Sequence, residues 1–231
     1  MTPYIELHAR SAFSFLRGSS APEHLAYRAA DLELPAVALC DRDGVFGAPR
    51  FHTAAQESKI RSLIGCELTM EDGSVLPVIV RSRNGYQNLC RLLSRAKLRA
   101  PKNESSIGWN ELTEFREGLL GLTGDEEGPL QRALRHGNLA QADKRLADLK
   151  RCFGADGILV ELQRHHLREE PWFERQLIRL AEKHRLKLVV TNGVLYATSD
   201  RRPYWMFSPV LASTRILIMP VASLNQIQNA N

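Results

Sequence analysis

Short apolar segments alternate along this chain with longer amphipathic segments, and this alternation limits the folds it can adopt more than any other feature. The apolar segments have the length and composition of buried strands, and the amphipathic segments have the spacing of surface helices. Strands separated by helices run parallel and are joined by right-handed crossovers. About seven strands within roughly 200 residues favour a closed or nearly closed α/β barrel over an open sheet.

The expected strands and helices follow one another in a simple order. The strands are expected at residues 4–7, 36–40, 63–68, 76–80, 118–123, 158–162 and 186–191. The helices are expected at residues 22–32, 48–57, 84–98, 129–135, 139–153 and 171–184. The sequence Ser20-Ala-Pro-Glu23 suits a capping box before the first helix, and Asn84 suits the start of the third. The turn sequence Glu71-Asp-Gly-Ser74 indicates a hairpin between the third and fourth strands.

Composition excludes several other classes of protein. Hydrophobic residues make up 44% and charged residues 25% of the 231 residues, which argues for a folded chain. The net charge of +5 permits a nucleic-acid partner without requiring one. The four cysteines form no CxxC pair, so a zinc ribbon or finger is excluded. The amino terminus lacks the apolar core of a signal peptide, and no apolar run approaches the roughly 18 residues of a membrane span. We therefore expect a cytoplasmic protein without membrane contact.

Functional side chains of parallel α/β barrels gather where the strands end. His8, Asp41, Glu67 and residues 191–195 occupy such positions here. Imidazole nitrogen and carboxylate oxygen are suitable ligands for Zn²⁺ or Mn²⁺. Spacing alone is a weak signal, because a histidine at a strand end is more often simply hydrogen-bonded within the protein.

The segments around these residues resemble motifs of a known family. Leu7-His-Ala-Arg-Ser11, Ala38-Leu-Cys-Asp-Arg-Asp43 and Ile64-Gly-Cys-Glu67 resemble the first three motifs of PHP domains, which are distorted α/β barrels of metal-dependent phosphoesterases. Residues 83–89, 160–165 and 190–196 resemble stretches of the DNA polymerase III alpha branch. Phe13-Ser-Phe-Leu-Arg-Gly18 is similar to the corresponding segment in the error-prone branch of these polymerases. The resemblance covers residues 4–203 and implies a distorted (β/α)7 PHP-type barrel.

The resemblance also shows where this chain departs from the metal-binding pattern. Active members of the family carry histidine or acidic residues at the positions of Arg10, Arg17 and Arg42. Their final motif has an aspartate and a histidine where this chain has Gly193 and Leu195. Arginine offers no lone pair to a metal.

The surviving residues of ligand type are then His8, Asp41 and Glu67. We expect these three to be vestigial, and we expect no catalytic residue and no cofactor beyond weak residual Zn²⁺ or Mn²⁺.

Two roles are open for Arg10, Arg17 and Arg42. They can pair with Asp41, Asp43 and Glu67 and replace the charge of a metal with fixed cations. Alternatively, they can form an anion pocket that binds a phosphate of DNA or of a nucleotide. We favour pairing.

The composition changes after Pro203. Residues 204–231 contain no acidic residue, no lysine and a single arginine, Arg215. In the resembling family, Arg-Arg-Pro is followed by Leu-Asp-Val. The codons for Tyr-Trp-Met-Phe207 also encode Leu-Asp-Val when the reading frame is shifted to start at the third base of each codon. We therefore expect one barrel domain over residues 1–203 and an aberrant, frameshifted tail over residues 204–231.

The resemblance implies the amino-terminal domain of an error-prone DNA polymerase that acts in DNA replication and translesion repair. Its expected partners are a polymerase domain in cis, DNA, and other mutagenesis or replisome proteins. Because the polymerase carboxylates lie outside this chain, we expect no polymerase activity from it alone. The main alternative is a stand-alone metal-dependent PHP phosphoesterase or exonuclease, and another is a DNA- or protein-binding module without chemistry.

Overall fold

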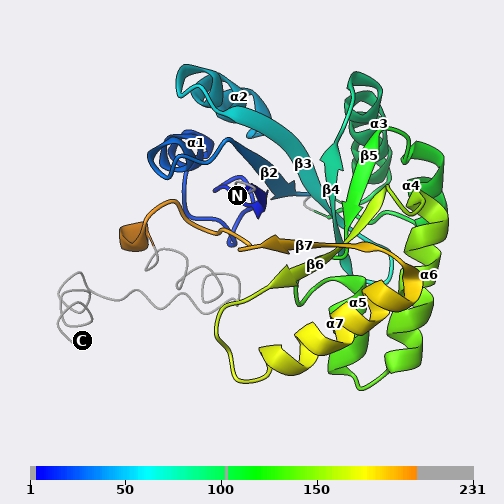
Figure 1. The fold of residues 1–231 in the computed structure, drawn as a ribbon. Coiled ribbons are helices and arrows are strands. Elements are labelled where there is room, and N and C mark those ends of the chain that lie inside the picture. Colours follow the sequence, from blue (N-terminus) through cyan, green and yellow to red (C-terminus); the bar gives the residue numbers. More distant parts are fainter. Residues whose placement is uncertain (1–3, 102–103, 202–231) are drawn as a thin grey trace, which may run out of the picture.

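A computed structural model of the protein describes residues 4–101 and 104–201, and its ribbon is drawn in Figure 1. Seven strands form one sheet in the order in which they occur along the chain. They are β1 (Glu6–Ala9), β2 (Ala36–Arg42), β3 (Arg61–Thr69), β4 (Val75–Val80), β5 (Leu119–Leu122), β6 (Ile158–Gln163) and β7 (Lys187–Thr191). The sheet curls into a nearly closed barrel, so the predicted distorted (β/α)7 barrel is confirmed.

The direction of β4 departs from the regular parallel pattern. The predicted hairpin after β3 is present, and β4 therefore runs antiparallel to both β3 and β5. The remaining neighbours pair in parallel. As a result, the carboxyl end of β4 lies at the opposite end of the barrel from those of its neighbours.

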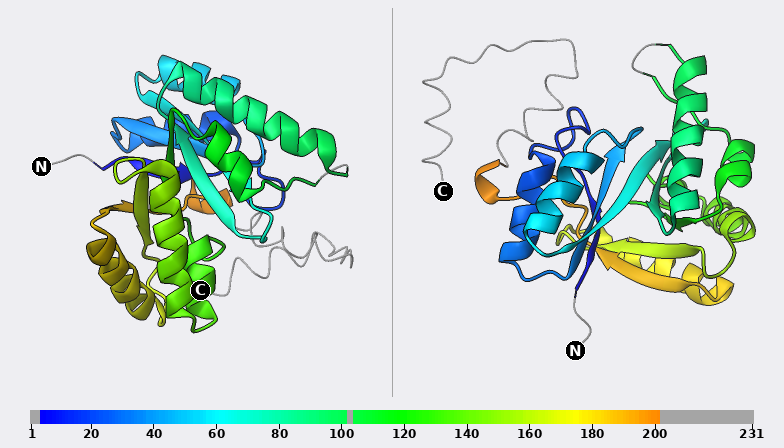
Figure 2. Two further views of the ribbon diagram at one scale, coloured as in Figure 1. Left: turned by 90° about the vertical axis from the view of Figure 1, so that its right-hand side faces the viewer. Right: turned by 90° about the horizontal axis from the view of Figure 1, so that it is seen from above.

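Helices surround the sheet on its outer side, as Figures 1 and 2 show. They are α1 (Pro22–Asp31), α2 (Ala48–Glu57), α3 (Arg83–Arg99), α4 (Trp109–Phe115), α5 (Pro129–Arg135), α6 (Leu139–Phe153) and α7 (Glu170–His184). A 3₁₀ turn at Ser199–Arg201 ends the described chain. Helix α4 was not predicted from the sequence. No helix among the described residues is both long and apolar enough to cross a lipid bilayer.

The two predicted helix caps are wrong in detail. The N-cap of α1 is Ala21, which makes no side-chain cap hydrogen bond. The hydroxyl of Ser20 instead accepts a hydrogen bond from the Ala197 amide, 2.9 Å away. At α3 the N-cap is Ser82, whose hydroxyl accepts from the amide of Gly85. Ser20 does not cap α1 because its hydroxyl is used by Ala197, which is distant in sequence. Asn84 does not cap α3 because Ser82 already takes that position.

Apolar side chains fill only one half of the barrel interior. Ala38, Cys40, Ile79 and Leu122 are buried together there, with Leu7 and Val189 among the side chains packed against them. Larger clusters lie between the sheet and the helices. The interior at the carboxyl ends of the parallel strands is therefore left to polar side chains, and the functional site is expected at this end.

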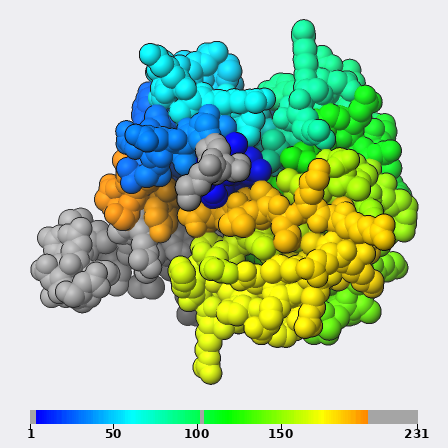
Figure 3. All heavy atoms as spheres, viewed as in Figure 1, coloured from blue at the N-terminus to red at the C-terminus, as the bar shows by residue number. Residues whose placement is uncertain are grey.

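The barrel closes between β7 and β1 through individual hydrogen bonds. The amide of Arg10 donates to the carbonyl of Val194 (2.8 Å), and the amide of Asn192 donates to the Glu6 carboxylate (2.9 Å). The outward side chains Leu188 and Val190 of β7 are exposed, and β7 lies at the surface in Figure 3. The predicted domain boundary at residue 203 and the predicted tail at 204–231 lie outside the described residues.

Candidate functional site at the carboxyl ends of the strands

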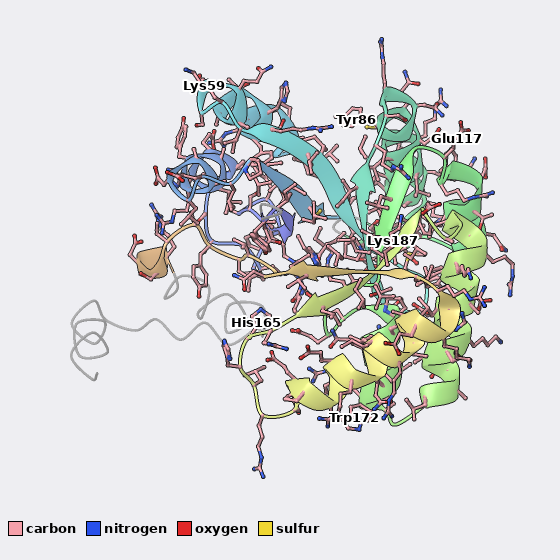
Figure 4. All side chains as sticks on the ribbon, in the orientation of Figure 1. Lys59, Tyr86, Glu117, His165, Trp172 and Lys187 are labelled. Atoms are coloured by element: carbon pink, nitrogen blue, oxygen red, sulfur yellow. The ribbon has the colours of Figure 1, made fainter. Side chains whose placement is uncertain are left out.

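The two ends of the barrel can be told apart in Figure 4. His165 follows the carboxyl end of β6, whereas Lys187 starts β7 and Glu117 precedes β5. At the end marked by His165, side chains from β1, β2, β3 and β6 and from the loop after β5 meet inside the barrel. We call this group the charged network. It consists of His8, Arg10, Arg17, Arg42, Glu67, Asp125, Glu127 and Glu161.

His8 lies between two carboxylates at the centre of the network. Its Nδ1 is 2.8 Å from Glu161 Oε1 and its Nε2 is 2.9 Å from Glu67 Oε1. Burial of His8 acts to lower its pKa, but the charge of Glu161 and the hydrogen bonds to both carboxylates outweigh burial and raise the pKa to about 10. Both ring nitrogens therefore carry protons at neutral pH, and His8 acts as a buried cation.

Glu67 is the hub of the network. Besides His8, it accepts hydrogen bonds from Arg10 Nε (2.8 Å) and from Arg42 Nε (2.8 Å). The Glu67 side chain is fully buried, which acts to raise its pKa. The charge of Arg10, the hydrogen bond from His8 and the charge of Arg42 outweigh burial and hold the pKa well below its usual range. Glu67 is thus a fixed anion held by three cations.

The arginines extend the network to the loop after β5. Arg10 also donates to Asp125, and Arg42 Nη2 donates to Glu127 Oε2 at 2.9 Å. Arg17 forms a two-pronged pair with Glu127, one contact of which is 2.8 Å long. Four cationic side chains therefore meet four carboxylates, and the network is electrically balanced.

The predicted pairing of the arginines is confirmed for Glu67 and wrong for the two aspartates. Asp41 accepts hydrogen bonds from the Ser11 amide and hydroxyl and from the Ser14 hydroxyl. Asp43 accepts from the amide and hydroxyl of Thr69. Asp41 lies in the part of β2 whose alternate side chains Val37 and Leu39 pack toward the helices. Its side chain therefore braces the loop after β1 and takes no part in the network.

Three carboxylates of the network were not assigned to the site from the sequence. Asp125 and Glu127 lie just after the carboxyl end of β5. Glu67 was predicted as a site residue because it lies near the end of a strand in the same way. Glu161 stands within β6 and is fully buried. A charged residue inside an otherwise apolar strand is a signal that could have identified it.

The centre of the network also offers ligand atoms for a divalent cation. One ligand atom each from His8, Glu67 and Asp125 lies within 4.8 Å of the others. Glu161 Oε2 is buried and has no hydrogen-bond partner among the described residues. A neutral imidazole nitrogen and carboxylate oxygens fit Zn²⁺ or Mn²⁺, so His8 would have to release a proton when it binds such an ion. When bound, such an ion would polarise a phosphoryl oxygen. In this structure Arg10 pairs with Glu67 and Asp125, two of the three grouped residues.

Comparison with known proteins identifies the family. The sequence profile of the PHP domain matches residues 6–165. The chain belongs to the PHP domain family. An error-prone DNA polymerase of Mycolicibacterium paratuberculosis is 38% identical over 212 residues, which cover 87% of this chain and 19% of the relative. A DNA polymerase III subunit alpha of Caulobacter vibrioides is 32% identical over 206 residues, covering 84% and 18%. The chain thus spans about a fifth of the length of these relatives.

Solved structures share the PHP fold at low sequence identity. A putative metal-dependent phosphoesterase from Bifidobacterium adolescentis aligns with a TM-score of 0.58 at 15% identity, covering 90% of this chain and 97% of that one. A lesion-specific endonuclease from Pyrococcus furiosus aligns with a TM-score of 0.52 at 13% identity, covering 85% and 49%. These similarities confirm the barrel.

The expectation that this PHP domain has no cofactor is wrong. It rested on three surviving ligand residues, of which Asp41 lies outside the network. The structure adds Asp125, which forms a candidate metal group with His8 and Glu67. The motif comparison therefore chose one wrong ligand residue, Asp41, and could not supply Asp125, which lies outside the matched motifs.

The stability of the metal-free protein is expected to fall on both sides of a window between about pH 4.5 and 6.5. The pKa of Glu67, Glu161 and Glu127 is lowered in the fold, so their contribution is present above pH 4.5 and lost as the pH falls through their folded pKa values. The pKa of His8 is raised to about 10, so its contribution is complete below pH 6.5 and lost as the pH rises toward 10. Urea unfolding with a chelator, from pH 3 to 10, measures both slopes.

Glu127→Gln provides a test of the acid side of this window. It removes one depressed carboxylate and should make the loss of stability below pH 4.5 shallower. Glu114→Gln changes an exposed carboxylate that pairs with Arg95 and should leave the slope unchanged. Equal slopes for all three proteins would show that the network does not control the acid response.

Proposed function

We propose that this chain is the amino-terminal PHP domain of an error-prone DNA polymerase of the DNA polymerase III alpha type. The observation that carries the proposal is the 38% identity to an error-prone DNA polymerase across 87% of the chain. The complete enzyme would act in DNA replication and translesion repair, with its polymerase domain in cis and with DNA and other mutagenesis or replisome proteins as partners. The barrel alone would not extend a primer.

Within that enzyme the charged network serves as an internal brace. Glu67 is hydrogen-bonded to His8 of β1 and to Arg42 of β2 at once. Arg10, which directly follows β1, links Glu67 of β3 to Asp125 in the loop after β5. In the sheet each strand is hydrogen-bonded to its immediate neighbours. The side-chain contacts of the network connect strands that are not neighbours. The arginines that depart from the metal-binding pattern are the groups that make these links, which supports a structural role.

An anion pocket formed by Arg10, Arg17 and Arg42 is the less favoured role. Each guanidinium donates to at least one carboxylate of the network. A phosphate would have to displace these carboxylates. Salt-sensitive binding of single-stranded DNA that is lost in both Arg10→Ala and Arg42→Ala would support the anion pocket and overturn the bracing role.

A metal-dependent phosphoesterase is the second candidate function. It is favoured by the group of His8, Glu67 and Asp125 and by the similarity of the fold to a metal-dependent phosphoesterase. Its weakness is that Arg10 binds Glu67 and Asp125, the two carboxylates that a catalytic ion would need.

One pair of assays separates the two functions. Residues 1–201 replace the matched 212 residues of the Mycolicibacterium paratuberculosis relative, and the chimera is tested for primer extension. We expect extension by the chimera and none by the 231-residue chain. The isolated chain is also tested on single-stranded DNA with Mn²⁺ or Zn²⁺. Hydrolysis that disappears in Asp125→Asn, together with an inactive chimera, would favour the phosphoesterase.

A further inference from the structure

Three phenylalanine side chains stand at the edge of the barrel mouth. Phe15 is 83% exposed, Phe46 is 67% exposed and Phe13 is 39% exposed. Phe13 and Phe15 lie on the loop after β1, and Phe46 lies on the loop after β2. The ring of Phe13 lies 3.1 Å from the position that a Cβ on Gly47 would take. Phe46 is the neighbour of Gly47, so the loops come together here. We call these three residues the phenylalanine rim.

The loop that carries Phe13 and Phe15 is held in a fixed conformation. Ser11 and Ser14 donate to the carboxylate of Asp41, and the amide of Gly18 donates to the carbonyl of Ser14 (3.0 Å). Ser14 is buried, whereas the phenylalanines on either side of it are exposed. Leu16 has φ of 62°, a strained conformation for a branched side chain. The loop therefore presents its two rings outward at little further cost in ordering, which favours binding.

The charges around the rim favour a protein partner over a nucleic acid. Arg17 is paired with Glu127, and Arg50, which lies 5.9 Å from the ring centroid of Phe13, is paired with Glu23. Nucleic-acid sites combine stacking rings with cations that are available to phosphates. Aromatic rings with a balanced polar surround are typical of the centre of a protein interface.

The described chain ends beside this same loop. The hydroxyl of Ser19 donates to the carbonyl of Arg201 (3.1 Å), and the amide of Ser19 donates to the carbonyl of Leu195 (2.9 Å). Ser19 directly follows the segment that carries Phe13 and Phe15. In a longer protein, the polypeptide after residue 201 therefore starts next to the rim, and a covalent tether raises its effective concentration there.

We propose that the phenylalanine rim is the docking surface for the polypeptide that follows the barrel in the complete polymerase. The proposal rests on the proposed function, and the relatives, which are about five times as long as the matched region, have ample chain for it. The partner surface is apolar, with pockets for aromatic rings and no excess of charge. The rim would thus join the PHP barrel to the rest of the enzyme.

The test compares the same substitutions in the isolated chain and in the primer-extending chimera. Phe15→Ser with Phe46→Ser should leave the melting temperature of the isolated chain within about 1 °C, because both rings are exposed. In the chimera the same pair should lower the midpoint of heat inactivation by about 5 °C or more. Leu98→Ser changes a side chain that is 88% exposed on α3 and should have no effect in either protein.

Each other outcome has a definite meaning. An active chimera in which the rim variants and Leu98→Ser behave alike would overturn the docking surface and leave the proposed function intact. An inactive chimera beside a well-folded isolated chain would overturn both. If the isolated chain binds oligothymidylate and the rim variant loses tenfold or more of that affinity, the rim is a base-stacking surface and the docking proposal is wrong.

Discussion

Replacing Glu67 with glutamine should lower the free energy of unfolding by roughly 3–5 kcal/mol, because it leaves buried cations without their shared counter-ion. Glutamine keeps the shape of the side chain, so the loss reports charge and hydrogen bonding. Glu67 is fully buried and contacts His8, Arg10 and Arg42. Urea unfolding of the two proteins at pH 6 in the presence of a chelator measures the difference.

An exposed ion pair supplies the control. Glu114→Gln removes the partner of Arg95 at a site where both side chains are about half exposed, and it should cost far less stability than Glu67→Gln. If Glu67→Gln costs no more than Glu114→Gln, the charged network does not brace the barrel, and the structural role proposed for it fails.

Replacing Arg10 with methionine should weaken the metal-free domain and strengthen its binding of a divalent cation. Methionine keeps most of the apolar stem of the side chain and removes the charge. Because Arg10 donates to Glu67 and Asp125, its loss takes the cation away from Asp125 and one of three cations away from Glu67, at a cost of roughly 3–5 kcal/mol. Without the Arg10 cation the two carboxylates attract a divalent ion more strongly, and the affinity for Mn²⁺ or Zn²⁺ should rise by about tenfold or more, or about 1.4 kcal/mol.

Two further variants distinguish competition between Arg10 and the metal from a general effect of removing a positive charge. Arg17→Met removes a cation from the same network, but among the described residues the Arg17 guanidinium pairs with Glu127 and not with the three grouped ligand residues, so metal affinity should stay near that of the wild type. Arg10→Met combined with Asp125→Asn should lose the gain, because Asp125 supplies one of the grouped ligand atoms. Titration calorimetry with elemental analysis measures affinity and stoichiometry. Equal affinity in the wild type and Arg10→Met would show that Arg10 does not compete with the metal.

Most of the barrel could be predicted from the sequence, because buried strands and amphipathic helices leave strong periodic patterns. All seven strands lie where the apolar segments indicated. The helix α4 was missed because its seven residues are too few for a clear periodicity. The cap of α1 was misjudged because Ser20 has a partner, Ala197, that is distant in sequence. Local patterns carry no information about such contacts.

The candidate site was only partly predictable. His8 and Glu67 were found because they stand at strand ends within recognisable motifs. Asp41 shares those features, yet it points away from the network, and the direction of a side chain at a strand end depends on register and local turns. Asp125 was not assigned to the site, because its partner Arg10 lies 115 residues away in the sequence. Motif comparison indicated which ligands had been replaced by arginine, but only the fold shows which carboxylates those arginines contact.

The order of the strands has a consequence for how the chain folds during synthesis. Because each strand pairs with the one before it, a strand leaving the ribosome finds its neighbour already made, and early contacts remain local. Closure is different, since the hydrogen bond from Asn192 to Glu6 spans 186 residues. We expect the nascent barrel to stay open, with His8 hydrated, until the segment around Val194 has emerged and can pair with Arg10.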